Sequence, residues 1–317
     1  MARRRVLLLL KPLDVYPPRP LATSIQTNGD RTISSKILRH LDDRCRVHKE
    51  TIDHCKSIIE RRDLDWELIM RNNLSKSICH IDLVITVGGD GTLLKASHFM
   101  DGSVPVLGVN SDPTNDLEVE EMSEEFDARR STGYLCAATR GNFEQVLDEV
   151  LEGKKQPTEL PRISLKINGA KVQSCALNDI LMAHPCPASV SRFSFRIKKE
   201  CGDTSHLINC RSSGLRVSTA AGSTAAMQSA GGIPMHISMP DLQYMVREPI
   251  FPRELDIPLM HGFIKPNECM AISWYSQEGM VYFDGSHVYY KIRHGDVAEV
   301  SSDAPALKVF LPSSLLT

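Results

Sequence analysis

Hydrophobic residues follow one spacing in the first half of the chain and another in the second half. Short apolar runs at 6–10, 83–87 and 104–109 have the length of buried strands. Between the first two, apolar positions recur at spacings of three, four and seven, at Ile37, Leu38, Leu41, Cys45, Ile52, Cys55 and Ile59. This spacing predicts a long amphipathic helix, and 142–152 has a second helical pattern. Strands that alternate with helices in this way indicate a parallel sheet.

From Arg162 onward the hydrophobic period is two, which is typical of strands with one buried face. Alternation at 163–167 leads into Asn168-Gly169, and alternation at 281–283 leads into Asp284-Gly285; both pairs are hairpin-turn signals. Further strands are predicted at 193–197 and at 307–311. The predicted fold class is therefore α/β plus all-β, with an α/β domain at 1–156 and a β-rich domain at 157–317. The last strand, near 305–312, can pack on either domain.

Composition narrows the range of partners. The 317 residues carry 37 Lys plus Arg against 39 Asp plus Glu, so no basic surplus supports binding to nucleic acid or to an anionic membrane. The apolar run at 6–10 is too short for the core of a signal peptide. Nine cysteines without a Cys-x-x-Cys pair favour reduced thiols over zinc or disulfides. We therefore expect a cytoplasmic protein.

A glycine-rich turn follows the second apolar run. Residues 88–92 read Gly-Gly-Asp-Gly-Thr, and Leu93 then starts a predicted helix for which Thr92 is a plausible N-cap. A strand, a glycine turn and a helix together form a phosphate-binding arrangement, because glycine admits close approach and positive φ while backbone amides point at the anion. The turn matches neither the Walker A motif nor the dinucleotide Gly-x-Gly-x-x-Gly fingerprint.

Asp90 is the residue in this turn that needs an explanation, since a carboxylate repels a phosphate. It suits two tasks: removing a proton from a hydroxyl nucleophile, or holding a magnesium ion that bridges phosphates. The structural alternative is a tight turn in which Asp90 only caps backbone amides.

Two segments of the second half also suggest a binding site. Asn178-Asp179 interrupts an apolar run, and a buried acid-amide pair needs polar partners such as the hydroxyls of a ribose; a turn or a bulge is the alternative. Residues 218–232 are almost all small, which lets a flat ligand or another backbone approach closely. Close helix packing explains that segment equally well. His98 and His184 are interpreted as structural, and we predict no metal-ligand set in the protein.

Taken together, these motifs resemble the NAD kinases. The resemblance rests on Gly88–Leu94, on Asn178-Asp179, and on Gly222–Ala225 followed by Ser229–Gly232. The glycine-aspartate motif alone is shared with lipid kinases and resembles that of phosphofructokinases, but the other two motifs are not. Within the family, the stretches 106–114, 211–215 and 245–249 are most similar to plant NADH kinases.

The resemblance implies an ATP-dependent kinase that phosphorylates the adenosine ribose 2′-hydroxyl of NADH or NAD⁺. It implies a β-sandwich-like second domain, a homo-oligomer that we expect to be a dimer, and ATP with Mg²⁺ as co-substrate. Asp90 would be the catalytic base. The implied phosphate-binding residues are Gly88, Gly89, Gly91 and Thr92, and the implied dinucleotide-binding residues are Asp90, Gly91, Asn178, Asp179, Thr224, Ala225 and Ser229.

The chain departs from the family pattern at three places. Ala226 stands where most members have a tyrosine, and Ser213 stands where most have an aspartate. Residues 111–114, Ser-Asp-Pro-Thr, replace the usual Gly-x-Leu-Gly-Phe. We interpret these changes as a remodelled dinucleotide pocket that prefers NADH, whose reduced ring is uncharged.

Two other functions are alternatives to a dinucleotide kinase. A lipid kinase would share the glycine turn, but it would bind membranes, and no amphipathic basic helix supports this. A catalytically silent dinucleotide-binding regulator would have lost turnover through the changes at Ala226 and Ser213, but the intact Asp90 argues against it.

Overall fold

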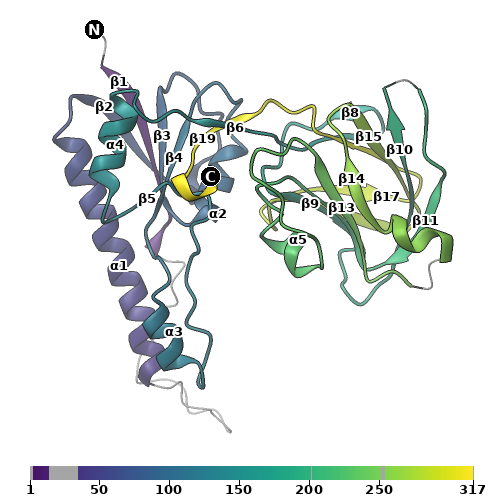
Figure 1. The fold of residues 1–317 in the computed structure, drawn as a ribbon, viewed down its shortest axis with the longest axis horizontal. Coiled ribbons are helices and arrows are strands. Elements are labelled where there is room, and N and C mark those ends of the chain that lie inside the picture. Colours follow the sequence, from purple (N-terminus) through teal and green to yellow (C-terminus); the bar gives the residue numbers. More distant parts are fainter. Residues whose placement is uncertain (1–2, 14–34, 201, 251–253, 317) are drawn as a thin grey trace. The chain divides into compact units, whose positions relative to one another are not determined.

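The computed structural model describes residues 3–13, 35–200, 202–250 and 254–316, which divide into two compact units (Figure 1). Unit 1 contains the described residues up to Ala96, together with Val104–Thr158 and the residues from Val309 onward. Unit 2 contains Ser97–Ser103 and Glu159–Lys308. The chain thus passes from unit 1 to unit 2 between Thr158 and Glu159, whereas the sequence placed the domain boundary after residue 156.

Most of a seven-stranded sheet of order β2-β1-β3-β4-β19-β6, with β5 beside β4, belongs to unit 1, and its strands β6 and β19 contain the points at which the chain leaves and re-enters that unit. The strands are β1 (Arg4–Leu10), β2 (Leu64–Met70), β3 (Leu83–Gly88), β4 (Val106–Asn110), β5 (Ala138–Thr139), β6 (Thr158–Leu160) and β19 (Leu307–Phe310). The pairs β1–β2, β1–β3, β3–β4, β4–β5 and β4–β19 are parallel, as the strand-helix-strand order predicted. The predicted last strand therefore packs in the first sheet.

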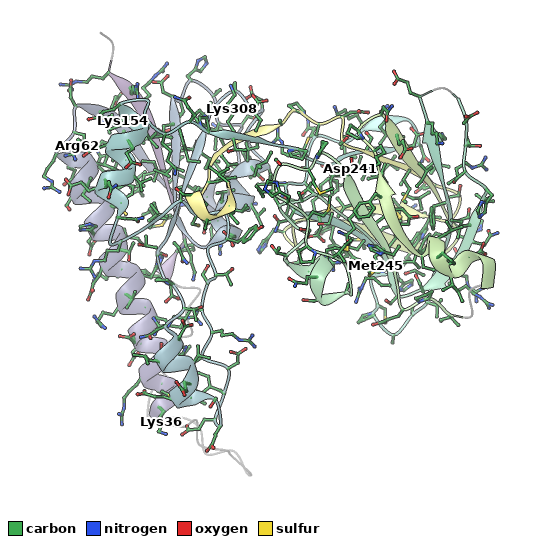
Figure 2. The ribbon with its side chains drawn as sticks, in the orientation of Figure 1. Lys36, Arg62, Lys154, Asp241, Met245 and Lys308 are labelled. Atoms are coloured by element: carbon green, nitrogen blue, oxygen red, sulfur yellow. The ribbon has the colours of Figure 1, made fainter. Side chains whose placement is uncertain are left out.

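Helices complete unit 1: α1 (Ser35–Glu60), α2 (Asp90–Ser97), α3 (Asp116–Met122) and α4 (Phe143–Leu151), with short 3₁₀ turns at Arg71–Asn73 and Ser313–Leu315. The apolar faces of α1 and α4 join one core with the sheet, as the spacing of their hydrophobic residues predicted. Arg62, just after α1, is labelled in Figure 2. It binds Asp148 of α4 with two hydrogen bonds of 2.9 Å and fixes the two helices to each other. No helix among the described residues is long and apolar enough to span a membrane.

Unit 2 consists of two six-stranded sheets, ordered β11-β10-β15-β18-β7-β8 and β14-β13-β12-β9-β16-β17. The strands are β7 (Ser164–Ile167), β8 (Ala170–Lys171), β9 (Asp179–Ala183), β10 (Ser191–Lys199), β11 (Ile208–Ser212), β12 (Gly214–Ser218), β13 (Leu242–Arg247), β14 (His261–Ile264), β15 (Glu268–Trp274), β16 (Glu278–Phe283), β17 (Val288–Arg293) and β18 (Val297–Ser301). A four-residue helix, α5 (Ala226–Ser229), and a 3₁₀ turn at Glu254–Leu259 lie outside the sheets.

The inward residues of both sheets form one core, so unit 2 is a β-sandwich. Phe193 of the first sheet stacks on Trp274 with ring centroids 6.0 Å apart, and Val217 and Phe283 come from the second sheet. The two predicted hairpin turns are present. Asn168 and Gly169 form a two-residue loop between the paired Ile167 and Ala170, and both have the positive φ that a type I′ turn requires. Asp284 and Gly285 also have positive φ but begin a four-residue loop, because Phe283 pairs with Val288.

Arg162 is a buried cation that joins three stretches of unit 2. Its guanidinium donates to the carbonyl oxygens of Ser97 at 3.0 Å, Met100 at 2.8 Å and Pro305 at 2.6 Å. Gly102 lies in the same region with φ of +104°, and a Cβ there would come within 2.2 Å of the carbonyl oxygen of Ala306. These contacts explain why residues 97–103 belong to the β-rich unit.

Candidate active site

The glycine turn connects β3 to α2 at the carboxyl edge of the parallel sheet. A Cβ at Gly88 would lie 2.2 Å from the Thr92 hydroxyl oxygen, and one at Gly89 would lie 2.2 Å from that of Ser131. Neither glycine has positive φ, so close packing and not left-handed backbone explains both. Helix α2 already begins at Asp90, which places Thr92 within its first turn. The expectation that Thr92 caps the helix is therefore wrong.

Asp90 is held by backbone amides of a different segment. Its two carboxylate oxygens accept hydrogen bonds from the amides of Tyr134 at 2.9 Å and Leu135 at 2.8 Å. Burial raises the pKa of Asp90, and these two bonds partly oppose the rise. Oδ1 also accepts a hydrogen bond from the Cys136 thiol at 3.7 Å, whereas Oδ2 retains a further lone pair. The observed contacts are therefore compatible with a base as well as with a purely structural role.

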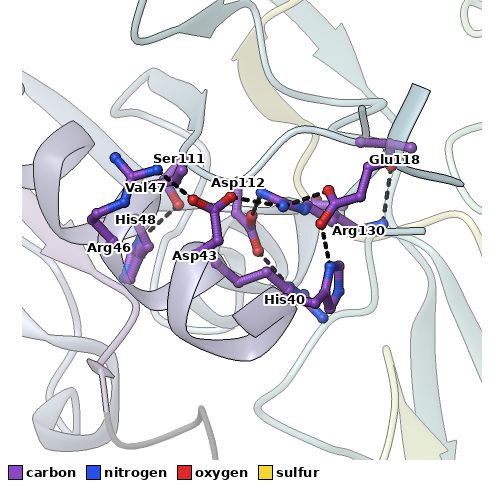
Figure 3. A network of polar contacts seen from close by, with 12 residues as sticks. His40, Asp43, Arg46, Val47, His48, Ser111, Asp112, Glu118 and Arg130 are labelled. Carbon is purple, nitrogen blue, oxygen red and sulfur yellow. Dashed lines mark hydrogen bonds and ion pairs between the residues drawn. The ribbon is translucent and has the colours of Figure 1, made fainter. Parts of the chain in front are cut away.

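The segment that holds Asp90 is anchored by an ion-pair network around Arg130 (Figure 3). Its guanidinium donates to Asp112 at 3.2 Å, to Asp43 of α1 at 3.0 Å and to Glu118 of α3 at 2.5 Å. Asp112 also accepts from Arg44 at 2.9 Å. The side chains of Arg130 and Asp112 are only 4% and 3% exposed, so their pairing is shielded from solvent.

Backbone contacts extend this network toward Asp90. The amide of Ser131 donates to the carbonyl of Asp112 at 3.2 Å, and the side-chain amide of Asn110 donates to the carbonyl of Ser131 at 3.1 Å. Gly133 packs directly on Asn110, where a Cβ would come within 2.4 Å. Asp112 and Arg130 thus fix residues 130–133, and the next two residues supply the amides that hold Asp90.

Lys11 is a cation near the glycine turn that the sequence reasoning missed. It follows β1, its amide donates to the carbonyl of Val87 at 2.9 Å, and its Cβ would lie 3.0 Å from a Cβ at Gly88. Burial lowers the pKa of Lys11 to about 8, although the charge of Asp112 opposes the change. Its position directly after an apolar run was a usable signal, because ligands bind at the carboxyl ends of parallel strands.

His48 completes this edge of the sheet. Its Nε2 donates to the carbonyl of Lys11 at 2.8 Å, and a carbonyl only accepts, so Nδ1 accepts from the Ser111 hydroxyl at 2.7 Å (Figure 3). Burial lowers the pKa of His48, which favours this neutral form. The histidine ties the end of β1 to the end of β4.

Unit 2 contains a cavity of about 550 Å³. Three of the predicted dinucleotide-binding residues line it: Asn178, Asp179 and Ala225. Ala226 and Tyr282 also line it. The described residues that line the cavity do not include Thr224, Ser229 or Ser213. Ser213 lies between β11 and β12, and its amide donates to the carbonyl of Arg247 at 3.1 Å.

Asp284, which the sequence marked only as a hairpin residue, fixes the Asn178-Asp179 pair. Its carboxylate accepts from the amides of Leu177 at 2.9 Å, Asn178 at 2.7 Å and Asp179 at 3.0 Å. Complete burial raises the pKa of Asp284 to about 7 despite these bonds. His98, interpreted as structural, lies with Nε2 3.5 Å from this carboxylate. No set of three or more metal-ligating side chains is found among the described residues.

The small-residue segment packs against the same pair. A Cβ at Gly222 would come within 2.2 Å of the carbonyl oxygen of Asn178, which also accepts from the amide of Thr219 at 2.9 Å. The segment therefore serves close backbone packing, and Ala225 at its end reaches the cavity. Close approach of another backbone is thus observed at Gly222, and contact of the segment with a ligand stays a prediction.

Arg216 is the second residue of this cavity that the sequence reasoning missed. It lies on β12 next to β9, and its Nη1 donates to a carboxylate oxygen of Asp179. A charged residue between Leu215 and Val217, both in the core, was the available signal.

Comparisons with known proteins agree with this architecture. The family model described as the ATP-NAD kinase N-terminal domain matches residues 2–114. A probable NADH kinase of Oryza sativa subsp. japonica is 62% identical over all of this chain and 99% of its own length. The chain belongs to the NAD kinase family. An NADH kinase of Arabidopsis thaliana is 56% identical over 98% of this chain and 96% of its own length.

Two solved structures, titled as an NAD kinase and an NADH kinase, have the same fold. An NAD kinase from Archaeoglobus fulgidus in complex with ATP has a TM-score of 0.65 at 18% identity, covering 98% of this chain and 95% of its own. Yeast NADH kinase complexed with NADH has a TM-score of 0.64 at 16% identity, covering 97% and 84%. These likenesses confirm the expected fold class, a mixed α/β sheet followed by two antiparallel sheets.

Proposed function

We propose that this NAD kinase family member transfers the γ-phosphoryl group of ATP to the adenosine ribose 2′-hydroxyl of NADH, and less efficiently to that of NAD⁺. The products are NADPH or NADP⁺ and ADP. The observation that carries the proposal is the full-length identity of 62% and 56% to two proteins named as NADH kinases. The likeness to structures named as complexes with ATP and with NADH supports the same pair of substrates.

Asp90 acts as the general base. As the ribose oxygen attacks the γ-phosphorus, a new O2′–P bond forms, the bond from the γ-phosphorus to the β–γ bridging oxygen breaks, and ADP leaves. The hydroxyl proton passes to the carboxylate of Asp90. The amides of Tyr134 and Leu135 hold this carboxylate in one orientation, so that the base is already positioned before the hydroxyl reacts.

The phosphates of ATP are assigned to the glycine turn. Residues 88–92 present backbone at the start of α2, where an anion can be bound, and a Cβ at Gly91 would meet no atom within 4 Å. Lys11 supplies a positive charge beside the turn. Magnesium enters as MgATP, as part of the substrate, and neutralises charge on the transferred group.

The dinucleotide is assigned to the cavity of unit 2, where Asn178, Asp179 and Ala225 meet. The side-chain oxygen of Asn178 is buried and lacks a hydrogen-bond partner among the described residues. A ribose hydroxyl would supply the missing donor. That Thr224 and Ser229 contact the dinucleotide stays a prediction.

Two properties of the whole protein belong to the proposal. A homodimer is supported by the family resemblance, and light scattering after gel filtration tests it. A cytoplasmic location is supported by the cysteines: the eight in the described residues are free thiols, as expected in a reducing compartment. Fluorescence of a tagged full-length chain in plant cells tests the location.

The deciding experiment is phosphorylation of NADH and NAD⁺ side by side with MgATP, measured as NADPH and NADP⁺ over a range of each dinucleotide. A higher kcat/KM for NADH supports the whole proposal. An equal or reversed preference keeps the kinase and removes the NADH assignment. No product from folded protein with either dinucleotide contradicts the proposal and favours the silent regulator or the lipid kinase.

A further inference from the structure

Three successive residues donate hydrogen bonds to the carboxylate of Asp90. They belong to a turn that begins at Gly133 and is closed by the amide of Cys136, which donates to the carbonyl of Gly133 at 2.9 Å. The amides of Tyr134 and Leu135, the two central residues of this turn, donate to the carboxylate. The thiol of Cys136 donates to it from the last position of the turn. One short turn of chain therefore supplies an amide, a second amide and a thiol to the proposed base.

The two oxygens of this carboxylate are not equivalent. Oδ1 accepts from the amide of Leu135 at 2.8 Å and from the thiol of Cys136, whose Sγ lies 3.7 Å away. Oδ2 accepts from the amide of Tyr134 at 2.9 Å. A carboxylate oxygen has two lone pairs, so both lone pairs of Oδ1 are used and one lone pair of Oδ2 is not. A proton added to Oδ1 would displace a donor, whereas a proton added to Oδ2 would displace none.

The thiol is held in place by strand β4. A Cβ at Gly108 of that strand would lie 3.1 Å from both the Cα and the Sγ of Cys136, so the strand packs directly on this residue. Cys136 is only 7% exposed. Burial, together with the charge of Asp90, raises the pKa of Cys136 well above its usual value. The sulfur therefore keeps its proton and remains a donor.

We propose that Cys136 is a positioning residue for the general base: its thiol donates to Oδ1 of Asp90, favours the ionised carboxylate and leaves Oδ2 as the oxygen that removes the ribose proton. The proton of the 2′-hydroxyl moves to Oδ2 as the O2′–P bond forms, and the thiol keeps its own proton. The inference rests on the proposed function, because it deepens the role given there to Asp90.

The thiol acts on Asp90 in the direction that a base requires. Burial raises the pKa of Asp90, and the amides of Leu135 and Tyr134 and the thiol of Cys136 oppose this rise. Within the described part of the chain, no charged side chain is among the groups that shift this pKa. A base must be deprotonated, so activity is lost as pH falls through the pKa of Asp90. Removing the thiol raises that pKa and moves the loss of activity to higher pH.

The test measures kcat/KM for NADH as a function of pH, because this quantity reports the pKa values of the free enzyme. In Cys136→Ala we expect the acid limb to move to higher pH by roughly half a unit to one unit, which is the size of effect that one weak hydrogen bond produces. Cys136→Ser has nearly the same size as the wild-type residue and keeps a donor. Its acid limb should lie at the wild-type pH or below it.

Cys55→Ala is the matched control. Cys55 is a fully buried thiol of helix α1 in the same unit, and burial alone raises its pKa to about 12. Its removal takes a thiol from the core without touching Asp90, so the acid limb should not move. An unshifted limb in folded Cys136→Ala overturns the inference. Equal shifts in Cys136→Ala and Cys136→Ser overturn it too, because the packing of the side chain and not its donor would then be responsible.

An infrared measurement depends neither on activity nor on the folding of Cys136→Ala. The S–H stretching band of Cys136 is identified as the band that is lost in Cys136→Ser. It should move to higher wavenumber as pH falls through the pKa of Asp90, because a neutral carboxyl group accepts a weaker hydrogen bond than a carboxylate. In Asp90→Asn the band should no longer depend on pH.

A band that does not move with pH in the wild-type protein overturns the inference. Failure of the proposed function is recognised separately, because the wild-type protein would then form neither NADPH nor NADP⁺. In that case the position of the S–H band still decides whether the thiol of Cys136 binds the ionised form of Asp90.

Discussion

Asp90 illustrates how one carboxylate can serve both structure and chemistry. It accepts the amides of Tyr134 and Leu135, so it has the capping role that sequence reasoning kept as the alternative. Its partners nevertheless come from another segment of unit 1 and not from its own glycine turn. The amides orient the carboxylate without using all its lone pairs, which is what a base in a fixed position requires.

Replacing Asp90 by Asn separates the two roles. Asparagine keeps the size of the side chain and one acceptor oxygen, but it cannot take a proton. We expect Asp90→Asn to lower kcat roughly 10²–10⁴-fold, with KM for the dinucleotide changed much less. Steady-state kinetics with both dinucleotides measure this. Asp63→Asn, at an aspartate whose side chain is 77% exposed, is the matched control and should behave as wild type. Near-normal turnover of folded Asp90→Asn would leave only the capping role.

At the scale of elements, the loop after β4 acts through its ion pairs. Asp112 binds Arg130 and Arg44, and Arg130 also reaches α1 and α3. Asp112 is one of residues 111–114, which replace a family motif and which the sequence interpretation linked to the dinucleotide pocket. In the structure they hold the segment that carries the amides bound to Asp90.

A variant of Asp112 tests that connection. In Asp112→Asn the pairing with Arg130 is weakened, so the amides of Tyr134 and Leu135 are held less firmly on Asp90. Those amide bonds lower the pKa of Asp90, so their loss raises it further. Because the base must be deprotonated, activity is lost as pH falls through this pKa, and the acid limb of kcat/KM should move to higher pH. We expect kcat to fall by roughly tenfold to hundredfold.

The control for this experiment lies in the same segment. Asp127→Asn breaks an exposed pair with Arg129, whose side chain is 72% exposed, and should leave the acid limb in place. The pH profiles of kcat/KM are all recorded below the unfolding temperature of each variant. An Asp112→Asn protein that is less stable but has an unshifted acid limb would show that the network supports only the fold.

The strength of local signals decided which elements the sequence could predict. Helix α1 and strands β1, β3 and β4 have continuous or periodic apolar faces, and the Asn-Gly and Asp-Gly turns require positive φ. Helix α3 was missed because it buries no residue and is held by charges such as Glu118. Strand β2 was missed because Asp65 and Glu67 interrupt its apolar residues at the sheet edge.

The same distinction applies to the site. Asn178, Asp179 and Ala225 belong to motifs, and the structure brings them to one cavity. Lys11 and Arg216 belong to no motif, and Asp284 belongs only to a turn motif that does not point to a binding site. Their importance depends on which strands are neighbours, and apolar periodicity does not specify neighbours.

At the scale of the whole molecule, the β-rich unit is inserted within the α/β unit. Strand β19 returns to pair with β4 through Val309–Val106 and Phe310–Leu107, all buried. Phe310 belongs to the same core as Leu107 and α4. Unit 1 therefore depends on the last strand of the chain.

The two tryptophans allow this dependence to be measured, because Trp66 lies in unit 1 and Trp274 in unit 2. We expect Phe310→Ala to destabilise unit 1 by about 3–5 kcal/mol, since it removes a buried ring from a packed core. Denaturant unfolding is followed by fluorescence in Trp274→Phe and Trp66→Phe backgrounds. The midpoint reported by Trp66 should fall more than that reported by Trp274.

Leu316→Ala, at a residue 49% exposed near the same end of the chain, is the control and should shift neither midpoint. An unchanged Trp66 midpoint in Phe310→Ala would contradict the role given to β19.

The position of β19 also has a consequence for biosynthesis. Proteins are made from the N-terminus, and domains generally fold as they leave the ribosome, the first one first. Here the order is reversed, because the β-sandwich is fully synthesised before the strand that completes the parallel sheet has emerged. The glycine turn and the carboxylate of Asp90 therefore remain on an incomplete sheet until β19 has been synthesised.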